Sequence, residues 1–205
     1  MQLRPKFCHW GSTMQYKQLG KSELKVSEVG FGVWTVATNW WGKIEPDDGV
    51  KLLQDAFELG VTLYDTADTY SEGYGEEILA KALASHRKEV IYSTKFGYDI
   101  YDSTPREGHK ERPQKFEPEF IRYACEQSLR RLKTDYIDLY QMHNPRVTAI
   151  QRDDVFATLE DLKTEGKIRY YGAALGPDIG WFEEGSTFMS ERDGVSVQII
   201  YSIIE

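Results

Sequence analysis

The sequence predicts an α/β fold, namely a (β/α)₈ barrel that is incomplete here, with about six β/α units and an N-terminal hairpin. Three observations predict it. Short β-branched and aromatic runs alternate with segments of helical period, and each connection between runs is long enough to hold a helix. The first of these connections, Gly30-Phe31-Gly32-Val33-Trp34, has no third glycine opening a helix, which disfavours an open dinucleotide-binding sheet.

The strands are predicted from the runs rich in β-branched and aromatic residues. A hairpin around Gly20-Lys21-Ser22 comes first and, in a barrel, would plug the N-terminal end; its arms are Tyr16–Leu19 and Leu24–Ser27. The six barrel strands are predicted at Glu28–Val33, Val61–Asp65, Val90–Lys95, Tyr136–Gln141, Ile168–Gly172 and Val195–Ile200.

The helices are predicted where apolar residues recur at spacings of three and four. Pro118–Leu132 shows this period most clearly, and Cys125 lies on its apolar stripe, so Cys125 is interpreted as a core residue. Pro46 suits a first helical turn, where its missing N–H costs little. The four predicted helices are Pro46–Leu59, Gly75–Ala84, Pro118–Leu132 and Asp153–Glu165.

Composition narrows the class of protein. The chain has 205 residues, with 33 acidic and 25 basic side chains and a formal net charge of −8 at pH 7. This balance argues against nucleic acid or an anionic membrane as a partner, because both need a basic face. Two cysteines are too few for a disulfide framework or a zinc site, so no metal and a reducing, cytoplasmic setting are expected.

Two segments stand apart from the predicted barrel. Residues 1–13 carry no apolar core typical of a secretory signal and are expected to be a disordered extension, with residues 14–205 forming the barrel domain. The long polar segment Phe96–Phe116 follows a strand directly. It is interpreted either as a loop over the site that shapes substrate choice or as a surface insertion.

Polar side chains follow three successive predicted strands. Asp65 ends the second strand, Tyr70 lies five residues later, Lys95 ends the third strand and His143 follows the fourth. In parallel barrels the chemistry sits at the C-terminal ends of the strands, so these four side chains are expected at one rim. Taken singly, each has an ordinary interpretation as a turn cap, a solvated lysine or a loop residue; their joint placement favours a site.

The four side chains have a coherent chemical use. A tyrosine hydroxyl has an ordinary pKa of about 10, and a nearby ammonium stabilises its phenolate and lowers that pKa. Asp65 would hold Lys95 against Tyr70, while His143 would donate a hydrogen bond to a bound carbonyl oxygen. The set predicts protonation of an oxyanion as it develops, while a hydride reaches carbon from elsewhere.

The segments Leu63–Tyr70, Ser93–Lys95 and Asp138–His143 together resemble the aldo-keto reductase family. The resemblance runs from about Tyr16 to Glu205 and implies a barrel that reduces aldehydes or ketones with a nicotinamide cofactor, usually NADPH, with NADH as the other candidate. It also assigns roles to the four residues. Tyr70 would be the general acid, Lys95 would tune its pKa, Asp65 would pair with Lys95, and His143 would orient the carbonyl.

The same resemblance implies a cofactor site made by Gly32, Trp34, Asp65 and Gln198. Gln198 matches the residue that hydrogen-bonds the nicotinamide carboxamide. After the fifth strand, however, Gly172-Ala173-Ala174-Leu175 stands where many family members carry Gly-Val-Ser-Asn. Gln198 is therefore the one side-chain anchor expected for the carboxamide.

The chain also departs from the family in length: it has 205 residues, whereas a complete barrel of this kind takes ~250. Residues 1–205 expressed alone are expected to be poorly soluble or to self-associate, since two strand edges would lack partners. They are also expected to show no saturable NADPH binding, because the resemblance places the phosphate contacts beyond Glu205. A non-catalytic regulatory subunit on the same fold, or an inactive fragment, is the alternative to the enzyme. The oligomeric state is left open.

Overall fold

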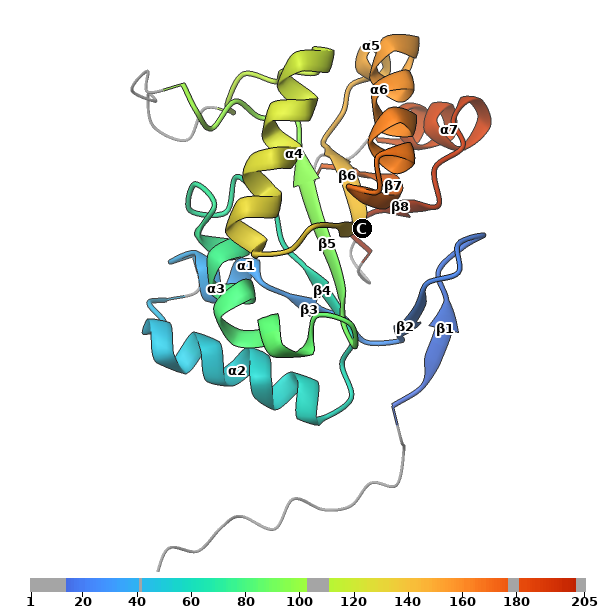
Figure 1. Cartoon of the computed structure of the whole chain (residues 1–205). Coiled ribbons are helices and arrows are strands. Elements are labelled where there is room, and N and C mark those ends of the chain that lie inside the picture. Colours follow the sequence, from blue (N-terminus) through green and yellow to red (C-terminus); the bar gives the residue numbers. More distant parts are fainter. Residues whose placement is uncertain (1–13, 41, 103–110, 177–180, 202–205) are drawn as a thin grey trace, which may run out of the picture.

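Six parallel strands form one curved sheet, and they follow one another in the sheet in chain order (Figure 1). The computed structural model describes residues 14–40, 42–102, 111–176 and 181–201. Each neighbouring pair of strands is parallel, so the predicted crossover arrangement is confirmed. The strands are β3 (Phe31–Gly32), β4 (Leu63–Asp65), β5 (Ile91–Phe96), β6 (Ile137–His143), β7 (Ile168–Ala174) and β8 (Ser196–Gln198).

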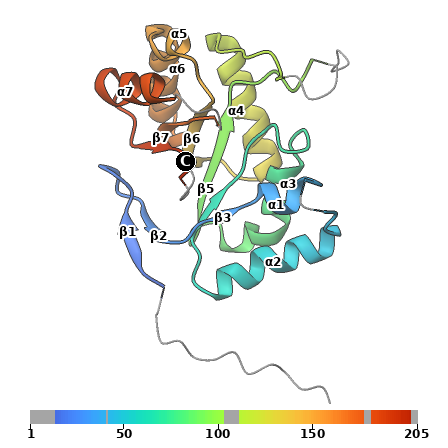
Figure 2. The same cartoon turned by 180° about the vertical axis from the view of Figure 1, so that it is seen from behind.

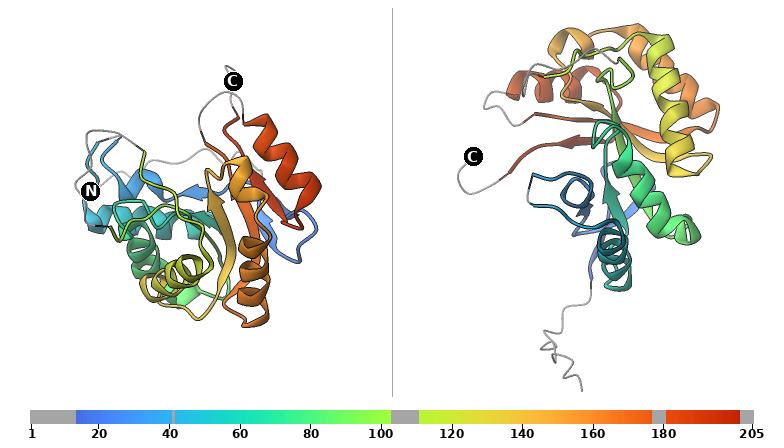
Figure 3. Two further views of the ribbon diagram at one scale, coloured as in Figure 1. Left: turned by 90° about the horizontal axis from the view of Figure 1, so that it is seen from above. Right: turned by 90° about the vertical axis from the view of Figure 1, so that its left-hand side faces the viewer.

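The longer helices follow one another round the outside of the sheet, as the view from above shows (Figure 3). This is the layering of a (β/α)₈ barrel, with strands inside and helices outside. The long helices are α2 (Pro46–Glu58), α3 (Tyr74–Leu83), α4 (Pro118–Leu132), α6 (Asp153–Thr164) and α7 (Phe182–Glu191). The shorter elements are α1 (Trp34–Ala37), the 3₁₀ helix η1 (Ala84–His86) and α5 (Val147–Ile150).

The predicted hairpin exists and consists of β1 (Tyr16–Gln18) paired antiparallel with β2 (Lys25–Ser27). Figure 2 shows it beside the end of the sheet opposite the arrowhead of β5. Ser27 exchanges hydrogen bonds with Thr62, just before β4, and the Glu23 N–H donates to the Tyr170 hydroxyl. The hairpin therefore lies against the N-terminal ends of the strands, as the sequence predicts.

Several element boundaries differ from the prediction. The first barrel strand is only Phe31–Gly32, shorter than the predicted Glu28–Val33. Trp34 begins the short helix α1, which was not predicted. Strand β6 continues two residues further than predicted, to His143, because its pairing with β7 continues to Ala174. Helix α7 was not predicted at all. Its apolar residues do not mark one buried face, since Phe182 is 84 % exposed.

The core lies between the sheet and its helices. The Phe96 and Tyr140 rings stack with their centroids 4.3 Å apart, and both residues are fully buried. Cys125 on α4 is also fully buried, as predicted for a core residue. Burial raises the pKa of its thiol to about 12, which keeps it protonated and unreactive at neutral pH.

Strands β3 and β8 are the outer strands of the six-stranded sheet. The chain after β8 exposes three apolar side chains, Ile199, Ile200 and Tyr201, the last to 89 %. Unpaired strand edges and exposed apolar residues favour association. Self-association of residues 1–205 expressed alone stays a prediction, which size-exclusion chromatography at increasing protein concentration would test. A dilution-independent monomer would contradict it.

A cluster of charges around the buried Asp138 side chain joins β5, β6 and β7 at their N-terminal ends. The Asp138 side chain is 1 % exposed and pairs with Arg87 at 2.8 Å and with Arg169 at 2.8 Å. It also accepts the backbone N–H of Tyr92. The Arg87 guanidinium stacks on the rings of Tyr92 and Tyr136, 4.4 Å and 3.9 Å from their centroids.

Substituting Asp138→Asn is expected to lower the free energy of unfolding by ~3 kcal/mol, because two cations lose their buried counter-charge. Urea unfolding followed by circular dichroism measures this directly. Asp135→Asn is the matched control, since Asp135 lies exposed three residues earlier. The control should change stability by less than ~0.5 kcal/mol. Equal effects of the two substitutions would show that the cluster is not structural.

Some sequence predictions fall outside the described residues, namely the extension 1–13 with Cys8 and the middle of the loop after β5. Among the residues that the structure describes, no helix is both long and apolar enough to cross a bilayer. Within the same ranges, no group of three His, Cys, Asp or Glu side chains is arranged to hold a metal ion.

Candidate active site

Side chains from four parallel strands meet at the C-terminal edge of the sheet. Asp65 ends β4, Lys95 is the last residue but one of β5, His143 ends β6 and Gln198 ends β8. Because the strands are parallel and in register, these ends share one edge. Tyr70 joins them from the loop that follows β4. The structure thus brings together the four residues predicted to be catalytic.

The Lys95 ammonium is the centre of this group. Its Nζ lies 2.6 Å from Asp65 Oδ2, 2.8 Å from the Thr66 carbonyl oxygen and 3.3 Å from the Tyr70 hydroxyl. Its side chain is 3 % exposed, while that of Asp65 is 20 % exposed. An ammonium has three hydrogens and can only donate, so these contacts use all of them. The Tyr70 oxygen accepts from Lys95, and the hydroxyl hydrogen remains available for another acceptor.

The backbone holds Tyr70 in place through a left-handed turn. Ser71 and Glu72 have φ angles of 47° and 55°, and Gly73 follows with φ 98°. The Gly75 N–H then donates back to the Tyr70 carbonyl at 3.1 Å. A Cβ on Gly75 would lie 2.6 Å from Thr66 Oγ1 and 3.1 Å from Tyr70 Cβ. Glycine at this position therefore lets helix α3 begin directly beneath the tyrosine.

Burial and charge act in opposite directions on the site's two proton-carrying groups. Burial raises the pKa of Tyr70 above its ordinary value; Lys95 lowers it, and Asp65 raises it again. The effect of Lys95 has the predicted sign, but burial outweighs it. Burial lowers the pKa of Lys95, whereas Asp65 and Tyr70 raise it, and the net pKa is above the ordinary value. At neutral pH the lysine is therefore charged and the tyrosine is protonated.

His143 is a neutral imidazole. Burial, together with the nearby Lys95 charge, lowers its pKa to about 3. Its ring meets the Tyr70 ring edge-on at 6.2 Å and the Tyr98 ring at 5.0 Å between centroids. In the described part of the chain its Nδ1 has no hydrogen-bond partner. A neutral imidazole carries one N–H, so His143 can donate a hydrogen bond without giving up a proton.

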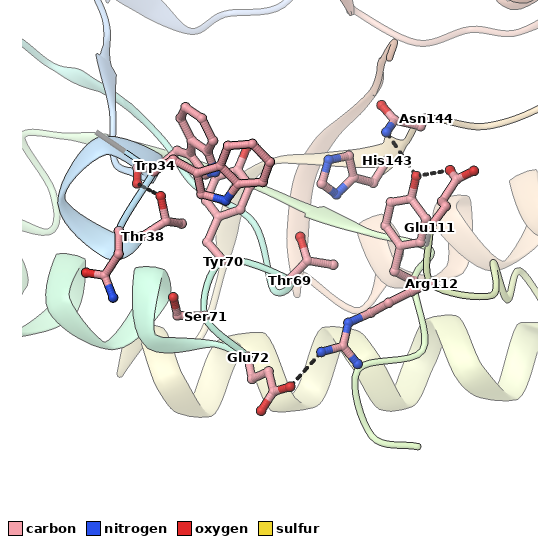
Figure 4. Close-up of a pocket in the computed structure, with 13 residues that line it drawn as sticks. Trp34, Thr38, Thr69, Tyr70, Ser71, Glu72, Glu111, Arg112, His143 and Asn144 are labelled. Carbon is pink, nitrogen blue, oxygen red and sulfur yellow. Dashed lines mark hydrogen bonds and ion pairs between the residues drawn. The ribbon is translucent and has the colours of Figure 1, made fainter. Parts of the chain in front are cut away.

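A cleft of about 1050 Å³ opens above Tyr70 and His143 (Figure 4). Trp34 and Trp40 form one wall, with their rings 5.8 Å apart. A volume of this order is typical of pockets that bind small organic molecules. The other lining residues are Thr38, Asn39, Thr69, Ser71, Glu72, Tyr98, Glu111, Arg112 and Asn144.

The described flanks of the loop after β5 form the opposite wall of this cleft. The Arg112 guanidinium donates to Glu72 at 2.6 Å, and this ion pair is visible in Figure 4. The Tyr98 hydroxyl accepts from Asn144 at 2.9 Å and donates to Glu111. Of the two interpretations of this segment, the described part therefore favours a loop that shapes the cleft; residues 103–110 lie outside the described ranges.

Gly32 and Gln198, two of the four residues predicted to hold a nicotinamide, are both accessible at the C-terminal edge of the sheet. Gly32 ends β3, and a Cβ built on it meets nothing within 4 Å, so a planar ring can approach the backbone there. The Gln198 side chain is exposed at the end of β8, where its amide can meet a carboxamide. The backbone N–H of Leu175 is already used, because it donates to the backbone carbonyl oxygen of Gln198 at 2.9 Å. It offers no substitute for the missing Ser and Asn side chains.

Gln141 and Ser93 are not among the site residues predicted from the sequence. Both belong to predicted strands and were interpreted as part of the sheet. Gln141 Nε2 donates to Ser93 Oγ at 3.0 Å and to Gln198 Oε1 at 3.2 Å. A polar side chain between apolar neighbours, in the run Leu139-Tyr140-Gln141-Met142, was the available signal.

Fold and site together define a partial (β/α)₈ barrel with a polar site at the C-terminal ends of its strands. Residues 28–205 match the family model described as the aldo/keto reductase family. The chain belongs to the aldo/keto reductase family, an oxidoreductase family that generally uses NAD(P)H. Both the predicted family and the predicted incomplete barrel are confirmed.

Relatives and solved structures agree with this assignment. The chain is 39 % identical over 193 residues to "Uncharacterized oxidoreductase YqkF" of Bacillus subtilis, covering 94 % of this chain and 58 % of that protein. It is 30 % identical to "Aldo-keto reductase YhdN" of the same organism, covering 94 % and 55 %. Among solved structures, the holo form of aldo-keto reductase AKR11C1 from Bacillus halodurans has a TM-score of 0.77 and 34 % identity, covering 93 % and 58 %.

A second solved structure, the glycerol dehydrogenase AKR11B4 from Gluconobacter oxydans, has a TM-score of 0.75 and 29 % identity. The match covers 93 % of this chain and 56 % of that one. The chain thus spans a little over half the length of these relatives.

Proposed function

We propose that the whole protein reduces aldehyde or ketone groups of small molecules to alcohols, with NADPH as the preferred cofactor and NADH as the other candidate. The observation that carries the proposal is the position of Lys95 Nζ, which contacts both Asp65 Oδ2 and the Tyr70 hydroxyl. A nicotinamide cofactor, when bound, supplies a hydride to the carbonyl carbon. The location that fits is the cytoplasm, as the low cysteine content predicts.

The chain's own residues supply the proton, orient the carbonyl and contact the cofactor. The Tyr70 hydroxyl donates its proton to the carbonyl oxygen as negative charge develops there. The Lys95 ammonium stabilises the phenolate that Tyr70 becomes, and Asp65 keeps the ammonium in contact. His143, neutral at pH 7, donates a hydrogen bond that orients the carbonyl. Gly32, Trp34, Asp65 and Gln198 are the residues assigned to the cofactor.

The experiment is a carbonyl-dependent assay with the purified whole protein. Loss of NADPH absorbance is followed with a panel of small aldehydes and ketones, and NADH is compared at equal concentration. We expect turnover that needs the carbonyl and is faster with NADPH. Saturable cofactor binding without turnover of any carbonyl would favour the regulatory subunit instead.

A further inference from the structure

Gln141 stands at the centre of the polar side chains between β5 and β8, although none of the predicted roles uses it. Its side chain is almost fully buried, with the residue 2 % exposed. It lies beside Lys95 on β5 and Gly172 on β7 in the parallel register. Its amide nitrogen contacts two residues that themselves contact Asp65, namely Ser93 and Gln198.

The direction of each hydrogen bond in this group follows from the Asp65 carboxylate, which only accepts. Ser93 Oγ lies 3.0 Å from Asp65 Oδ1, so the single Ser93 hydrogen is used there. Gln198 Nε2 lies 3.3 Å from Asp65 Oδ2, so this end of the Gln198 amide must be its NH₂. The side-chain oxygen of Gln198, Oε1, therefore faces away from the Asp65 carboxylate.

Two acceptors in this group, Ser93 Oγ and Gln198 Oε1, still require a donor, and the Gln141 amide supplies it. The Ser93 hydroxyl already donates its hydrogen to Asp65, so toward Gln141 its Oγ can only accept. Gln198 Oε1 is an amide oxygen and likewise only accepts from Gln141. The two hydrogens of Gln141 Nε2 are thus both committed, at 3.0 Å and 3.2 Å. The result is a closed ring of hydrogen bonds through Asp65, Ser93, Gln141 and Gln198.

We infer that Gln141 is a positioning residue that fixes the Gln198 amide in the orientation that meets the nicotinamide carboxamide. The inference rests on the proposed function. Gln198 is exposed on a strand of three residues, and a free glutamine side chain loses substantial rotamer entropy when it binds. Gln141 restricts that freedom before the cofactor arrives, which matters most where Ala174 and Leu175 offer no polar side chain.

The test is a double-mutant cycle on cofactor affinity in the whole protein. Gln141→Met keeps the side-chain length and removes both donors, and Gln198→Leu removes the amide that Gln141 holds. Fluorescence titration gives the dissociation constant for NADPH of each variant and of the double variant. We expect Gln141→Met to weaken binding ~3-fold to ~10-fold when Gln198 is present and by less than ~2-fold when it is absent. Equal losses in both backgrounds would overturn the inference.

A second readout needs no cofactor. In protein labelled with ¹⁵N-glutamine, the side-chain amide hydrogens of Gln198 should exchange with water several-fold faster in Gln141→Met than in the unsubstituted protein. The matched control is Gln151→Leu, because Gln151 is exposed at the end of α5. If Gln141→Met does not fold, Gln141→Leu replaces it in both measurements. Unchanged exchange in a folded variant would contradict the positioning role.

The two readouts separate failure of the inference from failure of the proposed function. If the unsubstituted protein binds NADPH and reduces carbonyls while Gln141→Met changes neither affinity nor amide exchange, the inference fails and the function stands. If the unsubstituted protein binds no nicotinamide cofactor, the proposed function fails, and the inferred role toward the carboxamide falls with it.

Discussion

Tyr70→Phe is expected to lower the rate of carbonyl reduction by ~100-fold or more in the whole protein. The substitution keeps the aromatic ring, which packs edge-on against His143, and removes the one hydrogen that Lys95 leaves available for the substrate. Cofactor affinity should change little, because the residues assigned to the nicotinamide come from β3, β4, α1 and β8. Steady-state kinetics with NADPH and a reactive aldehyde measure the rate.

The control for this experiment is Tyr123→Phe, which removes a hydroxyl from a tyrosine that is 49 % exposed on α4. It should leave both turnover and cofactor affinity unchanged. Fluorescence titration of each variant with NADPH then separates chemistry from binding. Turnover of Tyr70→Phe close to that of the unsubstituted protein would eliminate Tyr70 as the general acid.

Lys95→Met should lower reduction at least ~10-fold at neutral pH and should change its pH dependence. Reduction requires protonated Tyr70, so the rate falls as pH rises through the pKa of this hydroxyl. Lys95 lowers that pKa against the effect of burial. Without the ammonium the pKa is higher still, so the acid is weaker and the fall in rate moves to higher pH. Rate measurements from pH 6 to pH 11 in both proteins test the shift.

Stability has to be controlled in this second experiment, because Lys95→Met leaves the Asp65 carboxylate without its ammonium. Losing one partner of a buried pair costs about 3–5 kcal/mol, and the 20 % exposure of Asp65 places the expected loss at the lower end. The double variant Lys95→Met/Asp65→Asn should recover stability without recovering activity. Identical pH profiles for the unsubstituted protein and Lys95→Met would show that Lys95 does not tune Tyr70.

Helices with a regular apolar period were predictable from the sequence. Pro118–Leu132 was predicted with the bounds that α4 has, because Pro118 begins it and its apolar residues recur every three or four positions. Helix α7 was not, because only Gly185 and Phe188 are buried within it. Where one or two contacts decide whether a helix forms, the period carries no signal.

The meeting of Asp65, Lys95 and His143 was also predictable, since parallel strands present their C-terminal ends at one edge. The sequence by itself determined the alternation of strands and helices, the edge at which these residues lie and, through their motifs, the family. It did so because the period of side-chain burial and the chain direction are local properties.

Only the tertiary structure decided how the groups at that edge act on one another. Burial makes His143 neutral and raises the pKa of Tyr70 despite the Lys95 charge. The ring through Gln141 and Gln198 joins residues 57 positions apart in the chain. Desolvation and hydrogen-bond direction depend on which atoms surround a group in space, and that is fixed only when distant strands pack together.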